Sequence, residues 1–295
     1  MDSGSYRFHV GAFACAALSD GAFNYPLETL FANVPVAQVQ LALGQQNLAL
    51  DQMTTPYTCL FINTGDQRVL IDTGAGNLGA LAAHVYPTVN HATTVTGTLV
   101  ANLKAIGIQP ADIDTVVITH AHPDHVGGTL DSRGELMFAN ATYFIHPTEW
   151  DFWMSETALA HAPPPMVQIA RANLAPLENR LACVTDGTDI VPGIRVMATP
   201  GHTPGHIALA ITSAGTTLLH IADVVLSPLH LEHPTWVPSF DMAPHEAATS
   251  KRRICDHAAQ EHALVFAHHF PPFPTVGHVV KYGEGWQWQP LPINA

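Results

Sequence analysis

The chain has 295 residues, a length that fits one large domain or two small ones and that can bury a sizeable core. Apolar residues make up 47% of the chain and charged residues only 12%, which excludes a disordered protein. The 11 Lys and Arg are outnumbered by 24 Asp and Glu, and the resulting charge of -13 excludes a nucleic-acid partner, which would need a basic patch. The one basic run, "KRR" at 251–253, is expected on a solvated helix face.

The cysteines and the apolar runs bear on the compartment. No apolar run has the length of a membrane span, so no membrane partner is expected. The stretch "FHVGAFACAAL" near the start is interpreted as a first β-strand, because it contains His9 and lacks a clear cleavage site for a signal peptide. The cysteines form no CxxC pair, which excludes a disulfide scaffold or a zinc ribbon and fits a cytoplasmic protein; they are Cys15, Cys59, Cys183 and Cys255.

The first half of the chain alternates strands and helices. Residues 56–74 predict two strands joined by the turn "NTGDQ". Residues 98–107 have apolar side chains at helical spacing and end in a glycine, which predicts a helix. "IDTVVITH" at 113–120 predicts a short buried strand, and residues 141–153 predict another strand followed by an aromatic segment.

The second half follows the same pattern. A strand at 194–202 and a hairpin at 206–223 precede a helix at 241–262 and a final strand at 263–269. This alternation is typical of layered α/β proteins. The candidate linkers, 161–165 and 185–189, do not force a division, so a single domain over 1–295 is expected.

Residues 24–55 differ from the rest because they form a long, moderately apolar segment with few charges. A segment of this kind is typical of either a flap over a site or a surface that contacts a partner. The residue pattern leaves both interpretations open.

Four potential metal ligands lie within six positions of "THAHPDHVGG". These are His120, His122, Asp124 and His125, directly after an apolar run. A turn after a strand can direct alternate side chains to different sides, so that one short loop serves two metal ions. Imidazole and carboxylate groups together suit zinc, manganese, iron or cobalt.

Further ligands must come from elsewhere in the chain. His202 in "TPGHTPGH", Asp223 in "HIADVV" and a histidine of "AHHF" are the candidates. The two carboxylate oxygens of Asp223 can bridge two ions. The other histidines are interpreted as surface or hydrogen-bonded core residues, namely His9, His84, His91, His161, His257 and His262.

"THAHPDHVGG", "IDTG", "TPGHTPGH" and "IADVV" together resemble the metallo-β-lactamase fold superfamily, over a region from Asp72 to about His269. The resemblance implies an αββα sandwich, with two mixed sheets flanked by helices and a two-metal site at the sheet edge. It further implies that one metal is held by His120, His122 and His202, that the other is held by Asp124, His125 and the late histidine, and that Asp223 bridges them.

The resemblance also implies two finer assignments. Asp72 of "LIDTG" corresponds to a carboxylate that braces the histidine loop, in line with the need of metal ligands for outer partners. Of the two late histidines, His269 is favoured over His268, because His269-Phe270-Pro271 better fits the branch that includes methyl parathion hydrolase.

A pair of metal ions explains the expected reaction. Two metals roughly 3.5–4 Å apart can share one water, whose pKa falls to about 7, so that a bridging hydroxide is available at neutral pH. Asp124 could orient this hydroxide or pass a proton to the leaving group. The expected cofactors are two divalent transition metal ions, zinc first, with manganese, iron and cobalt as alternatives.

Local stretches such as "DFW" at 151–153 and "HPTWVPSFDMAP" at 233–244 resemble the branch of methyl parathion hydrolase and related lactonases. By position, Trp153 and Leu226 would line an apolar pocket for the leaving group, with ordinary core packing as the alternative. Leu226 stands where many acyl-homoserine lactonases have a tyrosine, which argues against that substrate.

The expected function is therefore a dinuclear hydrolase that attacks a neutral small-molecule lactone or aryl ester, with phosphotriesters as a side activity. The alternatives are a mono-iron persulfide dioxygenase, a glyoxalase II-like thioester hydrolase, a β-lactam hydrolase and a catalytically silent metal protein. Assembly into a homodimer is left open.

Overall fold

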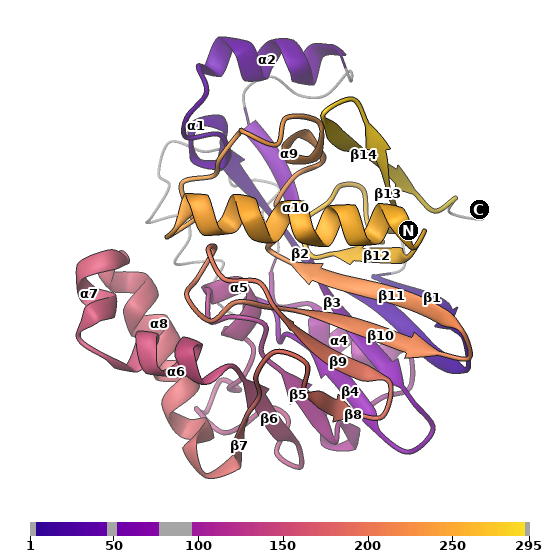
Figure 1. Cartoon of the computed structure of the whole chain (residues 1–295). Coiled ribbons are helices and arrows are strands. Elements are labelled where there is room, and N and C mark those ends of the chain that lie inside the picture. The colour runs from indigo at the N-terminus through magenta and orange to yellow at the C-terminus, as the bar shows by residue number, and fades with distance from the viewer. Residues whose placement is uncertain (1–3, 46–51, 77–95, 293–295) are drawn as a thin grey trace.

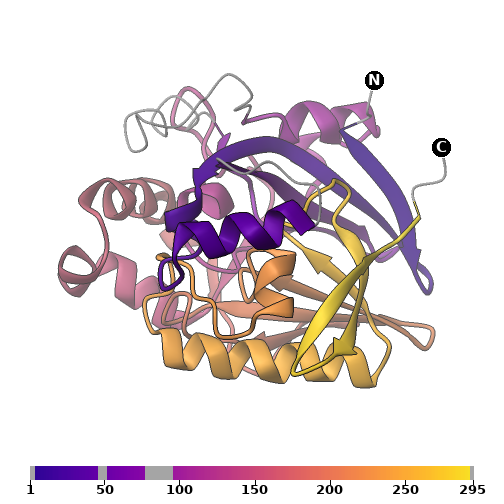
Figure 2. The same ribbon diagram turned by 90° about the horizontal axis from the view of Figure 1, so that it is seen from above.

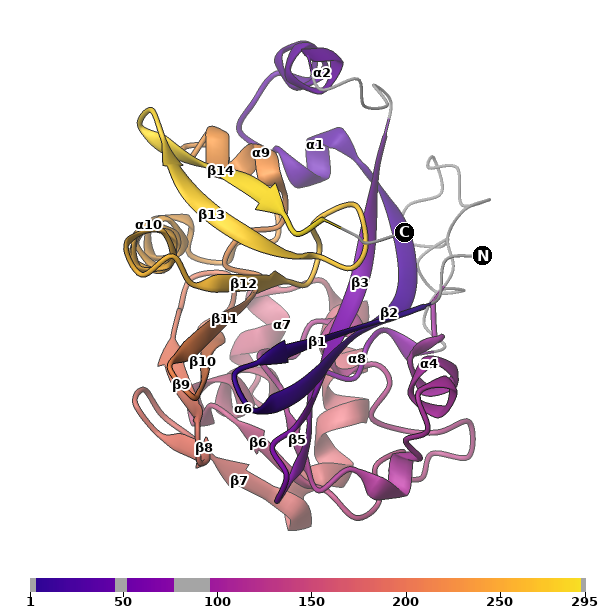
Figure 3. The same cartoon turned by 90° about the vertical axis from the view of Figure 1, so that its right-hand side faces the viewer.

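The computed structural model describes residues 4–45, 52–76 and 96–292. It contains two seven-stranded mixed sheets with helices on their outer faces, which confirms the predicted fold class. Figure 3 shows the two sheets between helix α10 on one side and helices α4 and α8 on the other.

The first sheet has the strand order β1-β2-β3-β4-β5-β6-β7. Strands β1 to β4 pair antiparallel, whereas β4 to β7 pair parallel. The strands are β1 (Ser5–Val10), β2 (Phe13–Pro26), β3 (Gln52–Asn63), β4 (Arg68–Ile71), β5 (Thr115–Val117), β6 (Thr142–Ile145) and β7 (Leu181–Cys183).

The second sheet has the order β14-β13-β12-β11-β10-β9-β8. Its only parallel pair is β11 with β12. The strands are β8 (Asp189–Val191), β9 (Ile194–Ala198), β10 (Ile207–Ser213), β11 (Thr216–Ala222), β12 (Leu264–Ala267), β13 (Val276–Tyr282) and β14 (Gly285–Pro290). The predicted linker 185–189 is the segment where the chain crosses from one sheet to the other.

Helices connect and cover the strands. The other candidate linker, 161–165, is not an extended segment, because it includes the end of α7 and the start of α8. The helices are α1 (Leu27–Leu30), α2 (Val36–Gln45), α4 (Leu99–Ala105), α5 (Pro123–Val126), α6 (Pro147–Met154), α7 (Thr157–His161), α8 (Pro164–Leu174), α9 (Pro228–Glu232) and α10 (Pro244–Gln260), with 3-10 turns η3 (Pro110–Asp112) and η4 (Ala175–Arg180).

The core lies in three layers that match this architecture. Leu60 and Ile71 of the first sheet pack with Leu209 and Phe266 of the second, all fully buried, in the layer between the sheets. One further cluster fills the space under α4, α6 and α8, and another lies under α10. Burial of this apolar area is the main force that holds the two sheets face to face.

The start of the chain forms a hairpin rather than a single strand. Strands β1 and β2 pair with Val10 opposite Phe13, and Gly11 has a φ of 55° in the turn. A glycine adopts this left-handed conformation without the steric cost of a Cβ. The predicted strand over "FHVGAFACAAL" was therefore correct in type but missed the turn at its centre.

The segment 24–55 combines strand and helix. Its ends extend β2 and β3, and α1 and α2 lie between them at the end of the molecule opposite β7 and β8 (Figure 1). Figure 2 shows α2 from above. Leu30 and Leu43 pack with Leu229 of α9 and with Trp236, so the described part of the segment is anchored to the second half of the chain. Residues 46–51 lie outside the described residues, as do His84 and His91.

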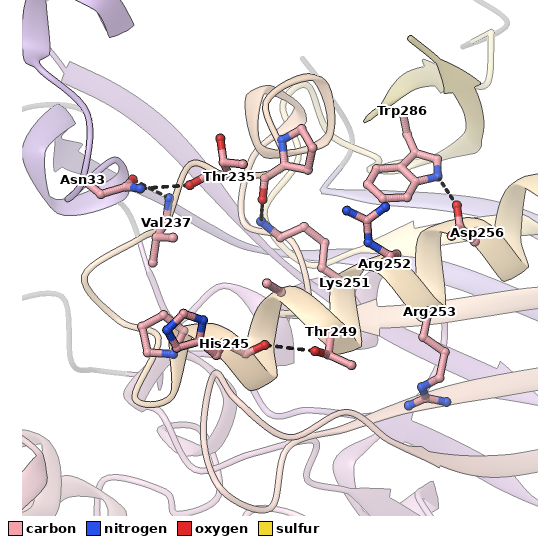
Figure 4. Close-up of a pocket in the computed structure, with 13 residues that line it drawn as sticks. Asn33, Thr235, Val237, His245, Thr249, Lys251, Arg252, Arg253, Asp256 and Trp286 are labelled. Atoms are coloured by element: carbon pink, nitrogen blue, oxygen red, sulfur yellow. Dashed lines mark hydrogen bonds between the residues drawn. The ribbon is translucent and has the colours of Figure 1, made fainter. Parts of the chain in front are cut away.

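The "KRR" run is only partly solvated. Arg252 and Arg253 are exposed, but Lys251 is buried on α10. Its Nζ donates to the carbonyl oxygens of Pro234 and Trp236, at 3.3 and 3.4 Å, and Figure 4 shows the side chain of Lys251 with one of these hydrogen bonds dashed. The prediction of a solvated face was wrong for Lys251, because the loop that precedes α10 folds back over the helix. Among the described residues, no helix has the length and apolar character of a membrane span.

Candidate metal centre

The predicted site residues follow the carboxyl ends of neighbouring strands. Asp72 follows β4 and His120 follows β5, which are parallel neighbours in the first sheet. Asp223 follows β11 and His269 follows β12, which are the parallel pair of the second sheet. Parallel strands bring their carboxyl ends to one edge, so this topology gathers the side chains at a single place.

The candidate ligands form two groups, and within each group one potential ligand atom per residue lies within 4.8 Å of all the others. The side chains of these residues are buried except for that of Asp124, which is 13% exposed. The first group is His120, His122, His202 and Asp223, and the second is Asp124, His125, His268 and His269.

Asp223 stands between the two groups. Its Oδ2 lies 3.2 Å from Nε2 of His202 in the first group and 3.3 Å from Nε2 of His269 in the second. Its Oδ1 lies 3.2 Å from Nε2 of His125. One carboxylate thus reaches ligand nitrogens of both groups, which is the geometry that a bridging ligand needs.

Asp72 orients His125 of the second group by contacting the ring nitrogen that points away from the other ligands. Its Oδ2 lies 2.8 Å from Nδ1 of His125, and the backbone N–H of Thr119 donates to its Oδ1 at 2.8 Å. An ionised carboxylate can only accept, so Nδ1 of His125 carries the hydrogen and Nε2 keeps its lone pair for the centre. The φ of Asp72 is 61°, a conformation that Asp and Asn tolerate better than most side chains.

Two further histidines are held in the same way. Nδ1 of His202 lies 2.9 Å from Oδ1 of Asp241, and Nδ1 of His269 lies 3.1 Å from the carbonyl oxygen of Pro56. Both rings therefore direct Nε2 inward. Asp241 was not identified from the sequence, although it lies in the quoted stretch 233–244, because nothing in that stretch indicates which histidine it approaches.

His206 holds Asp223, the candidate bridging residue, through the backbone N–H of Asp223. The N–H of Asp223 donates to Nε2 of His206 at 3.1 Å, and Nδ1 of His206 lies 2.8 Å from Oγ1 of Thr199. Ala222, directly before Asp223, has a φ of 43°, which is strained for a residue with a Cβ. The second histidine of "TPGHTPGH" thus supports a ligand and was not given this role from the sequence.

The charges of the centre favour a cation. Burial and, to a lesser extent, the neighbouring His202 lower the pKa of His122 to about 3, so this ring is neutral and can offer a lone pair. Burial alone would also lower the pKa of His202, but Asp223 and Asp241 raise it to about 9. The carboxylates therefore stabilise positive charge at the centre, whether it is a proton or a metal ion.

The donor set fits metal ions for a second reason. Nε2 of His125 and Oδ1 of Asp223 are buried and lie 3.2 Å apart, but neither makes a hydrogen bond in the protein. Leaving such atoms unpaired in the interior costs about 1–3 kcal/mol each. A metal ion between these atoms would satisfy both, since each presents a lone pair.

His268 differs from His269 in its contacts. The ring of His268 stacks on His125 with centroids 4.0 Å apart, and neither of its nitrogens has a hydrogen-bond partner. His269 instead lies 3.3 Å from both Asp124 and Asp223. The ring of His268 thus packs behind a ligand, whereas His269 faces both carboxylates.

The two residues assigned to the pocket are both buried. Trp153 is fully buried, its indole N–H donates to Glu149 at 2.6 Å, and its ring meets that of His122 edge-on with centroids 5.7 Å apart. Leu226 is 6% exposed and lies three residues after Asp223. Glu149 was not singled out from the sequence, because its partners other than Trp153 lie on loops far away along the chain.

Aromatic side chains lie beside the histidines. Phe240 is 6.5 Å from His122 between ring centroids and 5.5 Å from Tyr25. The hydroxyl of Tyr25 lies 2.6 Å from that of Tyr57, whose ring is 5.5 Å from His269. This aromatic wall therefore touches ligands of both groups.

Comparison with known proteins places these features in a family. The sequence profile of the metallo-beta-lactamase superfamily matches residues 54–269. The chain is 26% identical over 247 residues to the N-acyl homoserine lactonase AiiA of Bacillus thuringiensis subsp. kurstaki, which covers 80% of this chain and 91% of that protein.

Two solved structures are similar over nearly the whole chain. AidC, a dizinc quorum-quenching lactonase in complex with a product, N-hexnoyl-L-homoserine, has a TM-score of 0.88 at 26% identity, with 99% of each chain covered. The hydrolase AbOPH in the beta lactamase superfamily has a TM-score of 0.87 at 27% identity, with 100% of both chains covered.

The expected class of enzyme is confirmed, because the relatives and structural neighbours are metal-dependent hydrolases that include lactonases. The two ligand groups and the dizinc neighbour likewise support two metal ions. The profile spans more than two thirds of the chain and ends at the late histidine pair. This chain belongs to the metallo-beta-lactamase superfamily.

Proposed function

We propose that this chain is a dinuclear metal hydrolase that opens neutral esters, lactones first, aryl esters next and phosphotriesters as a side activity. The observation that carries the proposal is the position of Asp223, whose carboxylate lies 3.2 Å from His202 in one ligand group and 3.2 Å from His125 in the other. A carboxylate shared in this way can bridge two cations that bind side by side.

The proposed ligands follow from the two groups. His120, His122 and His202 hold one metal, Asp124, His125 and His269 hold the other, and Asp223 bridges them. Histidine and carboxylate donors without cysteine favour zinc, with manganese, iron or cobalt as possible substitutes. His268 is excluded from the proposed ligand set because its ring packs against the ring of His125.

Two bound metal ions supply a water activated at neutral pH and polarise the carbonyl oxygen of the ester. Asp124 is the proposed proton carrier. Its side chain is 13% exposed, compared with 3% for Asp223, so it is the carboxylate of the centre that meets entering substrate. Asp124 would hold the attacking water and deliver a proton to the leaving oxygen.

The surroundings favour a neutral substrate. Aromatic side chains lie beside ligands of both groups, Phe240 beside His122 and Tyr57 beside His269. An anionic substrate would want Lys or Arg nearby, and the whole chain has only 11. We propose that Leu226 contributes to the pocket and that Trp153 supports it from behind His122.

The relatives extend the proposal to acyl-homoserine lactones. AiiA is named an N-acyl homoserine lactonase, and AidC binds an acyl-homoserine product. Leu226, in place of a tyrosine, would then change how the leaving oxygen is held, while the aromatic wall accepts the acyl chain.

The test compares kcat/KM for a neutral lactone, N-hexanoyl-homoserine lactone, an aryl ester, a phosphotriester, S-lactoylglutathione and a β-lactam, all with one zinc-loaded preparation. The Asp223→Ala variant serves as the control for contaminating hydrolases. Lactones should lead the series. If the thioester or the β-lactam is turned over tenfold faster than every neutral ester and lactone, about 1.4 kcal/mol in transition-state preference, the proposal fails.

A further inference from the structure

Glu149 is a carboxylate at the start of α6 that the proposed reaction does not use. The residue is fully buried, and both oxygens of its side chain accept hydrogen bonds. Buried ionised groups are rare in protein interiors unless they are paired or fully hydrogen-bonded. The carboxylate of Glu149 accepts from four donors, and a side chain near the start of a helix does not need so many to form that helix.

The donors come from two loops and from α6 itself. Oε1 accepts from the backbone N–H of Ala121 at 2.9 Å and from the indole N–H of Trp153 at 2.6 Å. Oε2 accepts from the hydroxyl of Thr203 at 2.7 Å and from the backbone N–H of Gly205 at 2.9 Å. Each oxygen therefore holds one loop.

These two loops carry the three histidines of the first ligand group. Ala121 lies between His120 and His122, and Thr203 directly follows His202. Nε2 of His202 lies 2.9 Å from Nδ1 of His122. The spacing of these nitrogens depends on how the two loops are held relative to each other, and the carboxylate of Glu149 is one rigid group that joins them.

At Gly205 the His202 loop approaches helix α6 very closely. A Cβ placed on Gly205 would lie 2.2 Å from the backbone nitrogen of Glu149 and 2.6 Å from its Cβ. The loop can approach α6 this closely only because the residue is glycine. This close approach is independent of the hydrogen bonds and fixes the same loop to the same residue.

We propose that Glu149 is a positioning residue that couples the His120–His122 loop to the His202 loop and thereby sets the metal affinity of the first ligand group. The inference rests on the proposed metal centre. The hydrogen bonds of Glu149 go to the two loops and to Trp153, whose ring meets that of His122, and none goes to a ligand side chain, so its effect passes through these neighbours. The second group takes its ligands from Asp124, His125 and His269, and Glu149 makes no hydrogen bond to any of them.

Glu149→Gln is the informative substitution. The amide keeps the shape of the side chain but replaces one acceptor oxygen by an NH2 group. That NH2 must face either the N–H of Ala121 or the N–H of Gly205, neither of which can accept. One loop therefore loses its backbone hydrogen bond to residue 149, while the packing volume is preserved. Asp151→Asn, at an exposed position on the same helix, is the matched control.

The measurement is zinc affinity by competition with a chromophoric chelator, in the absence of substrate, in two backgrounds. In His269→Ala, where the first group alone is intact, Glu149→Gln should weaken zinc binding about 10-fold to 100-fold, the usual effect of losing an outer partner. In His202→Ala, where the second group is intact, it should change the affinity by less than about threefold. Asp151→Asn should leave both values unchanged.

Equal losses in both backgrounds, or no loss in the first, would overturn the inference. If Glu149→Gln does not fold, as judged by circular dichroism, Thr203→Val replaces it, because it removes one donor to Oε2 at constant volume. This variant should weaken the first group several-fold and spare the second, and any other pattern again overturns the inference. A wild-type chain that binds fewer than two zinc ions would instead overturn the proposed function.

Discussion

Asp72 and His125 form a fully buried pair in which the carboxylate Oδ2 lies 2.8 Å from the ring Nδ1. The contact joins the end of strand β4 to helix α5, and it fixes which ring nitrogen of His125 faces the candidate metal centre. Because Nδ1 of His125 holds its hydrogen toward Asp72, the other ring nitrogen, Nε2, is the one that can offer a lone pair to a metal ion.

Asp72→Asn should weaken metal binding by the second group about 10-fold to 100-fold. Asparagine tolerates the φ of 61° at this position, so the backbone should persist. Its NH2, however, would face either the Nδ1–H of His125 or the N–H of Thr119. Zinc competition measures the loss, and an affinity equal to that of the wild type would show that Asp72 does not orient His125.

The two late histidines should differ when each is replaced. His269→Ala should lose most of the second metal and most activity, because its Nε2 lies 3.3 Å from both Asp124 and Asp223. His268→Ala should keep two metals and be milder, because its nitrogens make no hydrogen bond and its ring stacks on that of His125. Elemental analysis of both variants after zinc loading decides the matter, and a greater metal loss in His268→Ala would reverse the assignment.

The outcome at these residues shows what a single sequence can reveal. His120, His122 and His125 were identifiable because they lie close together after an apolar strand, and the structure brings them to one centre. His202 and Asp223 lie far along the chain and were placed with them by motifs that are typical of the family.

The supporting residues were not identifiable for a physical reason. Asp241 lies 39 positions from His202, and Glu149 lies 54 positions from Thr203, so no local pattern joins them. A carboxylate in a sequence looks the same whether it is solvated or buried against donors. Lys251 was misjudged on the same ground, since its burial depends on the loop that folds over α10.

Metal removal should lower the thermal stability of the protein. The buried Nε2 of His125 and Oδ1 of Asp223 lie 3.2 Å apart without making a hydrogen bond, so bound ions would stabilise atoms whose hydrogen bonding is otherwise unsatisfied. A free zinc concentration about 1,000-fold above the dissociation constant stabilises a site by about 4 kcal/mol.

Differential scanning calorimetry before and after dialysis against a chelator measures this effect. The unfolding temperature should fall by several degrees and should recover when zinc is added back, which controls for irreversible damage. An unfolding temperature that is indifferent to both treatments would contradict binding at this centre.

Asp124→Asn should separate metal binding from proton transfer. The amide oxygen can still serve as a ligand, so the zinc content should stay close to two ions per chain. The amide cannot carry a proton, so kcat should fall by about 10²-fold to 10⁴-fold for a lactone, whose leaving alkoxide needs a proton as the ring opens. For an aryl ester with a nitrophenolate leaving group the loss should be much smaller, because that anion leaves without protonation.

The measurement is kcat for both substrates in the wild type, in Asp124→Asn and in the control Asp151→Asn. An equal loss on both substrates at full zinc occupancy would mean that Asp124 acts on the attacking water alone, and it would remove the leaving-group role proposed for it.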